Sequence, residues 1–169
     1  MCGIAGAISK THIAAGMIEA ASAAIGHRGP DDQGVQRITF AGGEVVLGNR
    51  RLAILDLSPA GHMPMSDPDT GNWITYNGEI YNFRELKQEL IQASDRFLSD
   101  SDTEVILKGY ARYGVEWLAR LRGMFALALF DARDEELVLA RDRFGIKPLY
   151  YWQSGAAFKI GRASCRERV

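Results

Sequence analysis

The chain has 169 residues, of which 47% are hydrophobic and 24% charged, and its formal net charge is −1. Such a composition is typical of a globular domain with a core, and the balanced charge argues against a nucleic-acid surface or a polybasic membrane anchor. The longest apolar run, residues 124–130, is far shorter than the about 20 residues that span a bilayer, so we expect a cytoplasmic protein without membrane contact.

The first half of the chain contains both strand and helix patterns. Residues 3–8 form a short apolar run that predicts a buried strand. Thr11 can cap a helix whose apolar side chains recur at helical spacing over 13–25, and Gly26 ends it. Residues 34–40 and 44–57 are predicted to be extended, and 58–71 form a loop.

The second half begins with a strand, followed by helices and then by strands. Residues 73–76 predict a strand that runs into a turn at Asn77-Gly78, and Asn82 opens a helix with Glu85 three positions later. Ser101 and Glu104 form a capping box for another helix, which ends at Gly114. Further strands are predicted at 124–131, 137–143 and 149–152.

Strands and helices are grouped separately along the chain, which favours an α+β fold of antiparallel sheets with helices on their outer faces. The last ten residues, 160–169, contain three arginines and one glutamate and follow no pattern. We interpret them as a non-native tail, so that the domain comprises residues 1–159. The chain contains two cysteines, Cys2 and Cys165, and three histidines, and none has metal-ligand spacing, so no metal site or cofactor is expected.

Cys2 is a candidate nucleophile. Removal of Met1 would place a thiol and a free α-amine on one residue. The amine, with an ordinary pKa of ~7.7–8.0, can accept the proton of a thiol with an ordinary pKa of ~8.5. This is the chemistry of N-terminal nucleophile hydrolases. A cysteine that merely precedes a buried strand is the alternative.

Four other residues can be explained with or without catalysis. Asn77 and Gly78 form the commonest two-residue hairpin turn, but an amide and a glycine N–H can also stabilise an oxyanion. Arg51 can bind a carboxylate or lie on a solvated strand face. Asp102 can bind a cation or simply favour a helix N-terminus.

Eight ordered blocks together resemble one family from Met1 to about Phe158. The chain is similar to the N-terminal glutaminase domain of glutamine-hydrolysing asparagine synthetases, which are class II glutamine amidotransferases. The blocks are CGIAG (2–6), HRGPD (27–31), RLAILDLS (51–58), GHMPM (61–65), NGEIYNF (77–83), SDTEVIL (101–107), LRGMFA (121–126) and ARDRFGIKPLYY (140–151).

The resemblance implies a four-layer αββα sandwich of two antiparallel sheets, of the N-terminal nucleophile hydrolase type. It implies that Cys2 attacks the glutamine side-chain amide and forms a thioester. Asn77 and Gly78 would form the oxyanion hole. Arg51 and Asp102 would hold the α-carboxylate and α-ammonium of glutamine, with Glu79 beside the site.

In such enzymes the ammonia passes to a C-terminal synthetase domain, which would use ATP and Mg and is absent from this chain. The resemblance also allows a homodimer of the full-length enzyme.

The chain departs from the family pattern at two places. Asn49 replaces a histidine of many relatives and is expected to be peripheral, and the strands after Tyr151 are expected to be missing. The alternatives are a class II glutaminase with another acceptor and a non-catalytic interaction module.

Overall fold

The computed structural model describes residues 2–161, so Met1 and most of the predicted tail lie outside the described residues. Two antiparallel sheets form its centre. The first sheet has the strand order β2-β3-β1-β9-β8, with β1 Gly3–Ser9, β2 Asp32–Phe40, β3 Gly43–Arg51, β8 Tyr150–Ser154 and β9 Ala157–Gly161. The second has the order β4-β5-β6-β7, with β4 Met65–Ser66, β5 Trp73–Ile80, β6 Gly123–Asp131 and β7 Glu136–Arg141.

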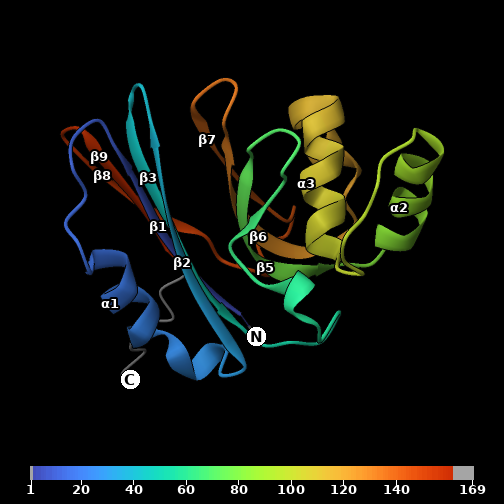
Figure 1. Ribbon diagram of the computed structural model, residues 1–169. Coiled ribbons are helices and arrows are strands. Elements are labelled where there is room, and N and C mark those ends of the chain that lie inside the picture. The colour runs from blue at the N-terminus through green and yellow to red at the C-terminus, as the bar shows by residue number, and fades with distance from the viewer. Residues whose placement is uncertain (1, 162–169) are drawn as a thin grey trace.

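Helices cover the outer face of each sheet (Figure 1). Helix α1, Met17–Ala24, lies on the first sheet, whereas α3, Asp102–Tyr113, lies on the second and α2, Phe83–Gln92, packs beside α3. Three short 3₁₀ helices complete the structure, at Gly26–Arg28, Pro59–Gly61 and Gly114–Arg120. Within the described residues, no helix is both long and apolar enough to span a membrane. The predicted four-layer sandwich is confirmed.

Successive side chains along each strand point to opposite faces of the sheet, so each strand packs against two layers. On β3, Val46 packs in a cluster with Ile18 of α1, whereas Val45 and Leu47 face the second sheet. On β6, Phe130 belongs to the cluster between the sheets and Leu129 to the cluster under α2 and α3. Each central strand is therefore apolar on both faces, as a four-layer arrangement requires.

Two predicted elements are shorter than the sequence indicated. The first helix begins at Met17 because Gly16 has a φ of 78°, and because the backbone of Ile13 is bonded to Glu44 and Arg37 instead. The extended segment over 44–57 ends at Arg51. Beyond it the chain folds back on itself, because Nη2 of Arg51 donates to the carbonyls of Leu55 and Asp56.

The expectation that no strand follows β8 is wrong. Strand β9 pairs with both β1 and β8, in a register that places Ala5 opposite Gly161. Ile160 points into the layer between the sheets and is buried, whereas Lys159 beside it is exposed. Ile160 and Gly161 therefore belong to the sandwich, which extends the domain two residues beyond the predicted boundary.

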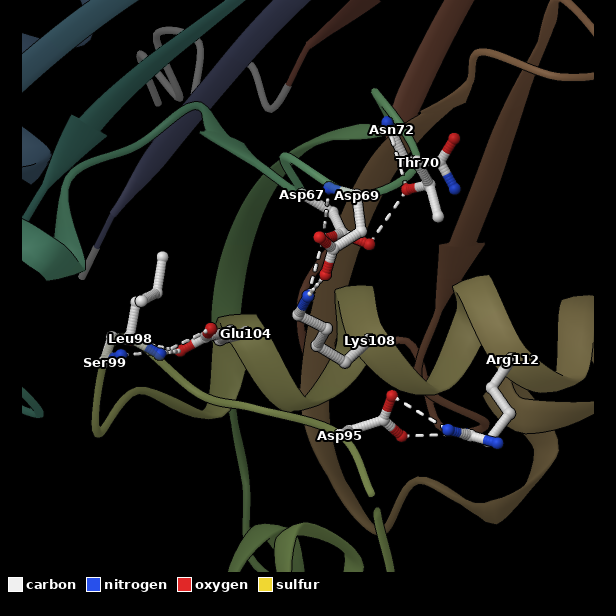
Figure 2. Close-up of polar contacts among 10 residues, drawn as sticks. All are labelled: Asp67, Asp69, Thr70, Asn72, Asp95, Leu98, Ser99, Glu104, Lys108 and Arg112. Atoms are coloured by element: carbon white, nitrogen blue, oxygen red, sulfur yellow. Dashed lines mark hydrogen bonds and ion pairs between the residues drawn. The ribbon is translucent and has the colours of Figure 1, made fainter. Parts of the chain in front are cut away.

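The N-terminus of α3 is fixed by one of the two bonds of the predicted capping box and by a second set of bonds. Oγ of Ser101 accepts a hydrogen bond from the backbone nitrogen of Glu104 at 3.3 Å. The Glu104 carboxylate does not reach back to Ser101. It accepts instead from the backbone nitrogens of Leu98 and Ser99, at 2.9 and 2.7 Å (Figure 2). The segment before the helix is thereby held against its first turn.

A buried ion pair holds the middle of α3. Nζ of Lys108 lies 2.7 Å from Asp67 and 2.8 Å from Asp69, both in the loop after β4 (Figure 2). The Asp67 side chain is almost completely buried, whereas that of Asp69 is 78% exposed. Because β4 pairs with β5, this contact fixes α3 relative to the strand that contains Asn77 and Gly78.

Candidate active site

One cavity brings together every site residue that the sequence predicted. They come from the residue before β1, the end of β3, the second half of β5 and the first residue of α3. The six are Cys2, Arg51, Asn77, Gly78, Glu79 and Asp102. The six positions span a hundred residues, so they are not neighbours in the sequence. The fold brings them together.

The predicted turn at Asn77-Gly78 is wrong. Both residues lie within β5, where Asn77 is opposite Ala126 and Gly78 opposite Phe125 of β6. The strand continues to Ile80 before the chain turns into α2. The hairpin explanation of this pair therefore fails, although Asn-Gly is the strongest local turn signal.

Asn77 presents an unsatisfied donor. The residue is 2% exposed, and its Nδ2 has no hydrogen-bond partner among the described residues. Leaving a buried donor unpaired costs about 1–3 kcal/mol, so such groups are rare and call for an explanation. Since Asn77 lines the cavity, a ligand there could accept this hydrogen bond.

The register of β5 determines where the Gly78 N–H points. The backbone nitrogen of Phe125, opposite Gly78, donates to the Asp142 carboxylate, and its carbonyl accepts from the Asp142 nitrogen. Both groups of Phe125 therefore point away from β5. Gly78 and Phe125 form a non-hydrogen-bonded pair, so the Gly78 N–H lies on the opposite edge of β5.

The neighbouring residues show the same direction. The carbonyl of Tyr76 accepts a hydrogen bond from Nδ2 of Asn49 at 3.1 Å, and the Ile80 nitrogen donates to Asp102 at 2.9 Å. Gly78 lies between them in the two-residue repeat of the strand. Its N–H therefore belongs to the row that faces Asp102, on the cavity side of β5.

A side chain at position 78 would not fit. An ideal Cβ there would lie 2.4 Å from the carbonyl oxygen of Met124 and 2.6 Å from Cα of Phe125. Both are backbone atoms of β6, so no side-chain movement could relieve the contact. Glycine is required by the close approach of the two strands.

Cys2 lies against the segment that follows β3. Its Sγ accepts a hydrogen bond from the Leu52 nitrogen at 3.4 Å and donates to the Leu52 carbonyl at 3.7 Å. The Cys2 carbonyl accepts from Nε of Arg28 at 3.4 Å. These contacts hold the half-buried thiol at the cavity.

Arg51 is 7% exposed, so its charge is an unusual feature of the cavity wall. Nη2 donates to the Leu55 carbonyl at 2.8 Å and to the Asp56 carbonyl at 2.6 Å. Neither bond uses Nε or Nη1. The folded loop thus fixes the guanidinium while leaving donors for an anionic group, which a planar arginine binds well.

Asp102 is 5% exposed, and hydrogen bonds hold its carboxylate in place. Its Oδ2 accepts from the Tyr76 hydroxyl at 2.7 Å and from the Ile80 nitrogen at 2.9 Å. Burial raises the pKa of this carboxyl, and the negative charge of Glu79 adds to the increase. Hydrogen bonds from the Tyr76 hydroxyl and from the backbone of Ile80 and Thr103 oppose it. A bound cation would favour the charged form.

Lys147 also lines the cavity, although no role was predicted for it. The residue is 3% exposed, and it lies in the loop after β7 that Asp142 organises. The Asp142 carboxylate accepts hydrogen bonds from the nitrogens of Ile146 and Lys147, at 3.0 Å each. The sequence could have pointed to this lysine only through its place in the block at 140–151. The spacing of residues in that block does not show that its side chain is buried.

From the sequence, we expected Asn49 to be peripheral, and this expectation is wrong. Asn49 is completely buried, and its Nδ2 donates to Oγ1 of Thr75 at 3.0 Å and to the Tyr76 carbonyl at 3.1 Å. The residue thus connects β3 of the first sheet to β5 of the second, and it holds the backbone of Tyr76, which lines the cavity. Among residues 2–161, no group of three or more His, Cys, Asp or Glu side chains could hold a metal ion.

Comparison with known proteins identifies relatives that match most of this chain. A family model described as a glutamine amidotransferase domain matches residues 1–164. Glutamine-hydrolysing asparagine synthetase 1 of Bacillus subtilis is 44% identical over 156 residues, which cover 89% of this chain and 24% of the relative. A putative asparagine synthetase of Methanocaldococcus jannaschii is 39% identical over 94% of this chain and 33% of its own length.

Other similar proteins have different names. The amidase chry2 of Gibberella zeae is 42% identical over 127 residues, which cover 75% of this chain and 18% of the amidase. A solved structure of glutamine phosphoribosylpyrophosphate amidotransferase from Bacillus subtilis superposes with a TM-score of 0.79 at 22% identity, over 95% of this chain and 42% of the other. The chain thus spans a third or less of these curated relatives.

Proposed function

The chain belongs to the glutamine amidotransferase family, and from this premise we propose that it hydrolyses the side-chain amide of glutamine to glutamate and ammonia through a thioester on Cys2. Its sandwich is of the N-terminal nucleophile hydrolase type. One observation carries the proposal: a thiol, a buried unpaired amide donor and the Gly78 edge of β5 line the same cavity as an arginine and an aspartate.

The first step is attack by the sulfur of Cys2 on the amide carbon of glutamine. With Met1 removed, the α-amine of Cys2 takes the thiol proton, and a C–S bond forms. The carbonyl oxygen becomes an oxyanion that accepts hydrogen bonds from Nδ2 of Asn77 and the N–H of Gly78. Both donors are in place before the reaction, so the transition state requires little reorganisation.

The second half of the reaction releases both products. The adduct collapses, its C–N bond breaks, and the proton held by the α-amine leaves with the nitrogen as ammonia. Water then attacks the thioester, the C–S bond breaks, and the thiol regains its proton. The same two donors stabilise the second oxyanion.

The non-reacting end of glutamine would be recognised by residues whose charges are opposite to its own. The free guanidinium donors of Arg51 suit the α-carboxylate, and the buried carboxylate of Asp102 suits the α-ammonium. Glu79 lies beside them in the cavity wall. A zwitterion thus meets one complementary charge at each pole, which specifies an amino acid rather than a simple amide.

The names of the relatives support two candidates for the ammonia acceptor. Those of the asparagine synthetases favour aspartate, converted to asparagine by a synthetase domain that would use ATP and Mg and would form part of a longer protein. The similarity to the amidase chry2 favours a second candidate, a glutaminase that supplies another acceptor. A purely structural module has no use for the unpaired Asn77 donor, so it is the least supported.

The proposal is tested by ammonia release from glutamine. Protein with Met1 removed is expected to release ammonia and to form glutamyl hydroxamate when hydroxylamine replaces water as the thioester acceptor. A Cys2→Ala variant with an unchanged melting temperature is expected to do neither. Equal rates in the two proteins would contradict the proposal.

A further inference from the structure

The Tyr76 hydroxyl has a place in this site that the proposed reaction does not yet use. Tyr76 is 2% exposed, lines the cavity and precedes Asn77 on β5. Its hydroxyl donates to Oδ2 of Asp102 at 2.7 Å, the shorter of that oxygen's two hydrogen bonds. Asn49 holds the carbonyl of the same residue at 3.1 Å. Tyr76 is therefore fixed at both its backbone and its hydroxyl.

We propose that Tyr76 is a positioning residue for glutamine recognition, which orients the Asp102 carboxylate and keeps it charged for the α-ammonium. This inference rests on the proposed function. The hydroxyl and the Ile80 nitrogen both donate to Oδ2, so the carboxylate is anchored through this oxygen at the wall of the cavity. A donor to a buried carboxylate stabilises its charged form.

The surrounding charges show why such a donor is needed. Burial and the negative charge of Glu79 both raise the pKa of Asp102, and Tyr76 opposes them. The cavity also contains Cys2 before β1, Arg51 at the end of β3 and Lys147 after β7. Without the hydroxyl, Oδ2 would keep the Ile80 nitrogen as its donor, and the backbone hydrogen bonds of Ile80 and Thr103 alone would oppose the increase in pKa. A protonated Asp102 cannot form an ion pair with glutamine.

The chain provides a matched control at Tyr110. This residue belongs to the same buried cluster as Tyr76 and is 7% exposed. Burial and the neighbouring Asp131 carboxylate raise its pKa to about 12. Tyr110 follows Asp102 by eight positions on α3, which corresponds to about 12 Å along the helix. A Tyr110→Phe change thus removes a comparable buried hydroxyl away from the cavity.

The decisive experiment compares glutamine with glutaramate, which lacks only the α-amino group. For Tyr76→Phe, we expect kcat/KM for glutamine to fall roughly 10-fold through KM, since hydrogen bonds to charged groups have effects of this size. The value for glutaramate should stay within about twofold, because that substrate has no ammonium for Asp102 to bind. Tyr110→Phe should change neither value.

The pH dependence of kcat/KM distinguishes this role from a purely structural one. A Tyr76 side chain that only filled space in the core would not change the pKa of Asp102. The acidic limb of kcat/KM for glutamine should shift to higher pH in Tyr76→Phe and stay in place in Tyr110→Phe. If the phenylalanine variant does not fold, 3-fluorotyrosine at position 76 keeps the ring and provides a stronger donor. The limb should then shift to lower pH.

Three results would overturn the inference. They are an equal loss on both substrates, a loss confined to kcat, and an unchanged acidic limb. In each of these cases the unsubstituted protein still hydrolyses glutamine, so the proposed function survives. If that protein neither hydrolyses glutamine nor binds it in a Cys2→Ala background, the proposed function fails and the role of Tyr76 fails with it.

Discussion

The sulfur of Cys2 accepts a hydrogen bond from the backbone nitrogen of Leu52 at 3.4 Å. Because Leu52 directly follows Arg51, the candidate nucleophile and the candidate carboxylate-binding residue share one stretch of backbone. Folding of the loop after β3 therefore places both at once. The reacting and non-reacting ends of glutamine would meet parts of the site whose spacing is set by the backbone rather than by flexible side chains.

Removal of Met1 is expected to control activity. A retained methionine would convert the α-amine of Cys2 into an amide, which cannot accept the thiol proton. Ammonia release should therefore be measured for processed protein, for protein that retains Met1, and for Cys2→Ala. We expect activity only in the first, and circular dichroism should show the same fold in all three. Equal rates would rule out Cys2 as the nucleophile.

Asn77→Ala is expected to lower kcat by roughly 10²- to 10³-fold with little change in KM, because an oxyanion donor acts mainly in the transition state. Its Nδ2 has no partner within residues 2–161, so loss of this group should have little effect on stability. Asn72→Ala is the matched control. Oδ1 of Asn72 accepts from the Ala132 nitrogen at 2.9 Å, so this change should lower the melting temperature and leave kcat unchanged. An Asn77→Ala variant altered in KM alone would contradict the assignment.

Arg51→Ala should raise KM for glutamine far more than it lowers kcat, because the α-carboxylate does not react. Arg50 is the matched control, since Nε of Arg50 donates to the Gly29 carbonyl at 3.2 Å and Arg50 does not line the cavity. Steady-state kinetics should show a normal KM in Arg50→Ala. A similar KM increase in both variants would mean that the effect comes from the β3 strand end rather than from the guanidinium of Arg51.

Gly78→Ala should destabilise the fold by about 1–3 kcal/mol, because the added Cβ overlaps the backbone of β6. A chain of this size would lose roughly 2–4 °C of melting temperature per kcal/mol. Gly161→Ala provides the comparison, since the atom of the described residues that a Cβ there would approach is the Ile4 carbonyl oxygen, at 3.9 Å. Thermal unfolding that is equal in the two variants would contradict the close approach of β5 and β6.

Lys108→Met should destabilise the protein by about 3 kcal/mol, because it leaves Asp67 charged, buried and without its cation. Asp69→Asn removes the exposed partner of the same lysine and should have a much smaller effect. Urea unfolding measures both. Similar midpoints for the two variants would show that burial of Asp67 is not what makes this ion pair important.

Local signals predicted the elements that local bonds stabilise. The capping box at Ser101 and Glu104 was recognised because its first bond spans only three residues. The turn at Asn77-Gly78 was predicted wrongly, because the backbone of β6, nearly fifty residues later, pairs with these residues and holds them extended. The helix before Met17 was predicted wrongly for a similar reason, since Glu44 is bonded to the Ile13 backbone from 31 positions away.

The candidate site shows the same division. Cys2, Arg51 and Asp102 were found because their chemistry and motifs are visible in the sequence, and the structure places them together. The contributions of Tyr76 and Asn49 were not found, because each depends on a hydrogen bond between segments that are 26 or 27 positions apart. No spacing rule connects such residues. The packing of α3 on β5 brings Asp102 to Tyr76, and the packing of one sheet on the other brings Asn49 to Tyr76.

The link that Asn49 forms between the sheets also bears on how folding can be followed. Each sheet could acquire its strands before the two dock, and a chain in that state would give a strand-rich circular dichroism spectrum. Its cavity would not exist, because Arg51 belongs to one sheet and Asn77 to the other. Recovery of glutaminase activity during refolding would thus time the docking of the sheets, a step that spectra of secondary structure do not report.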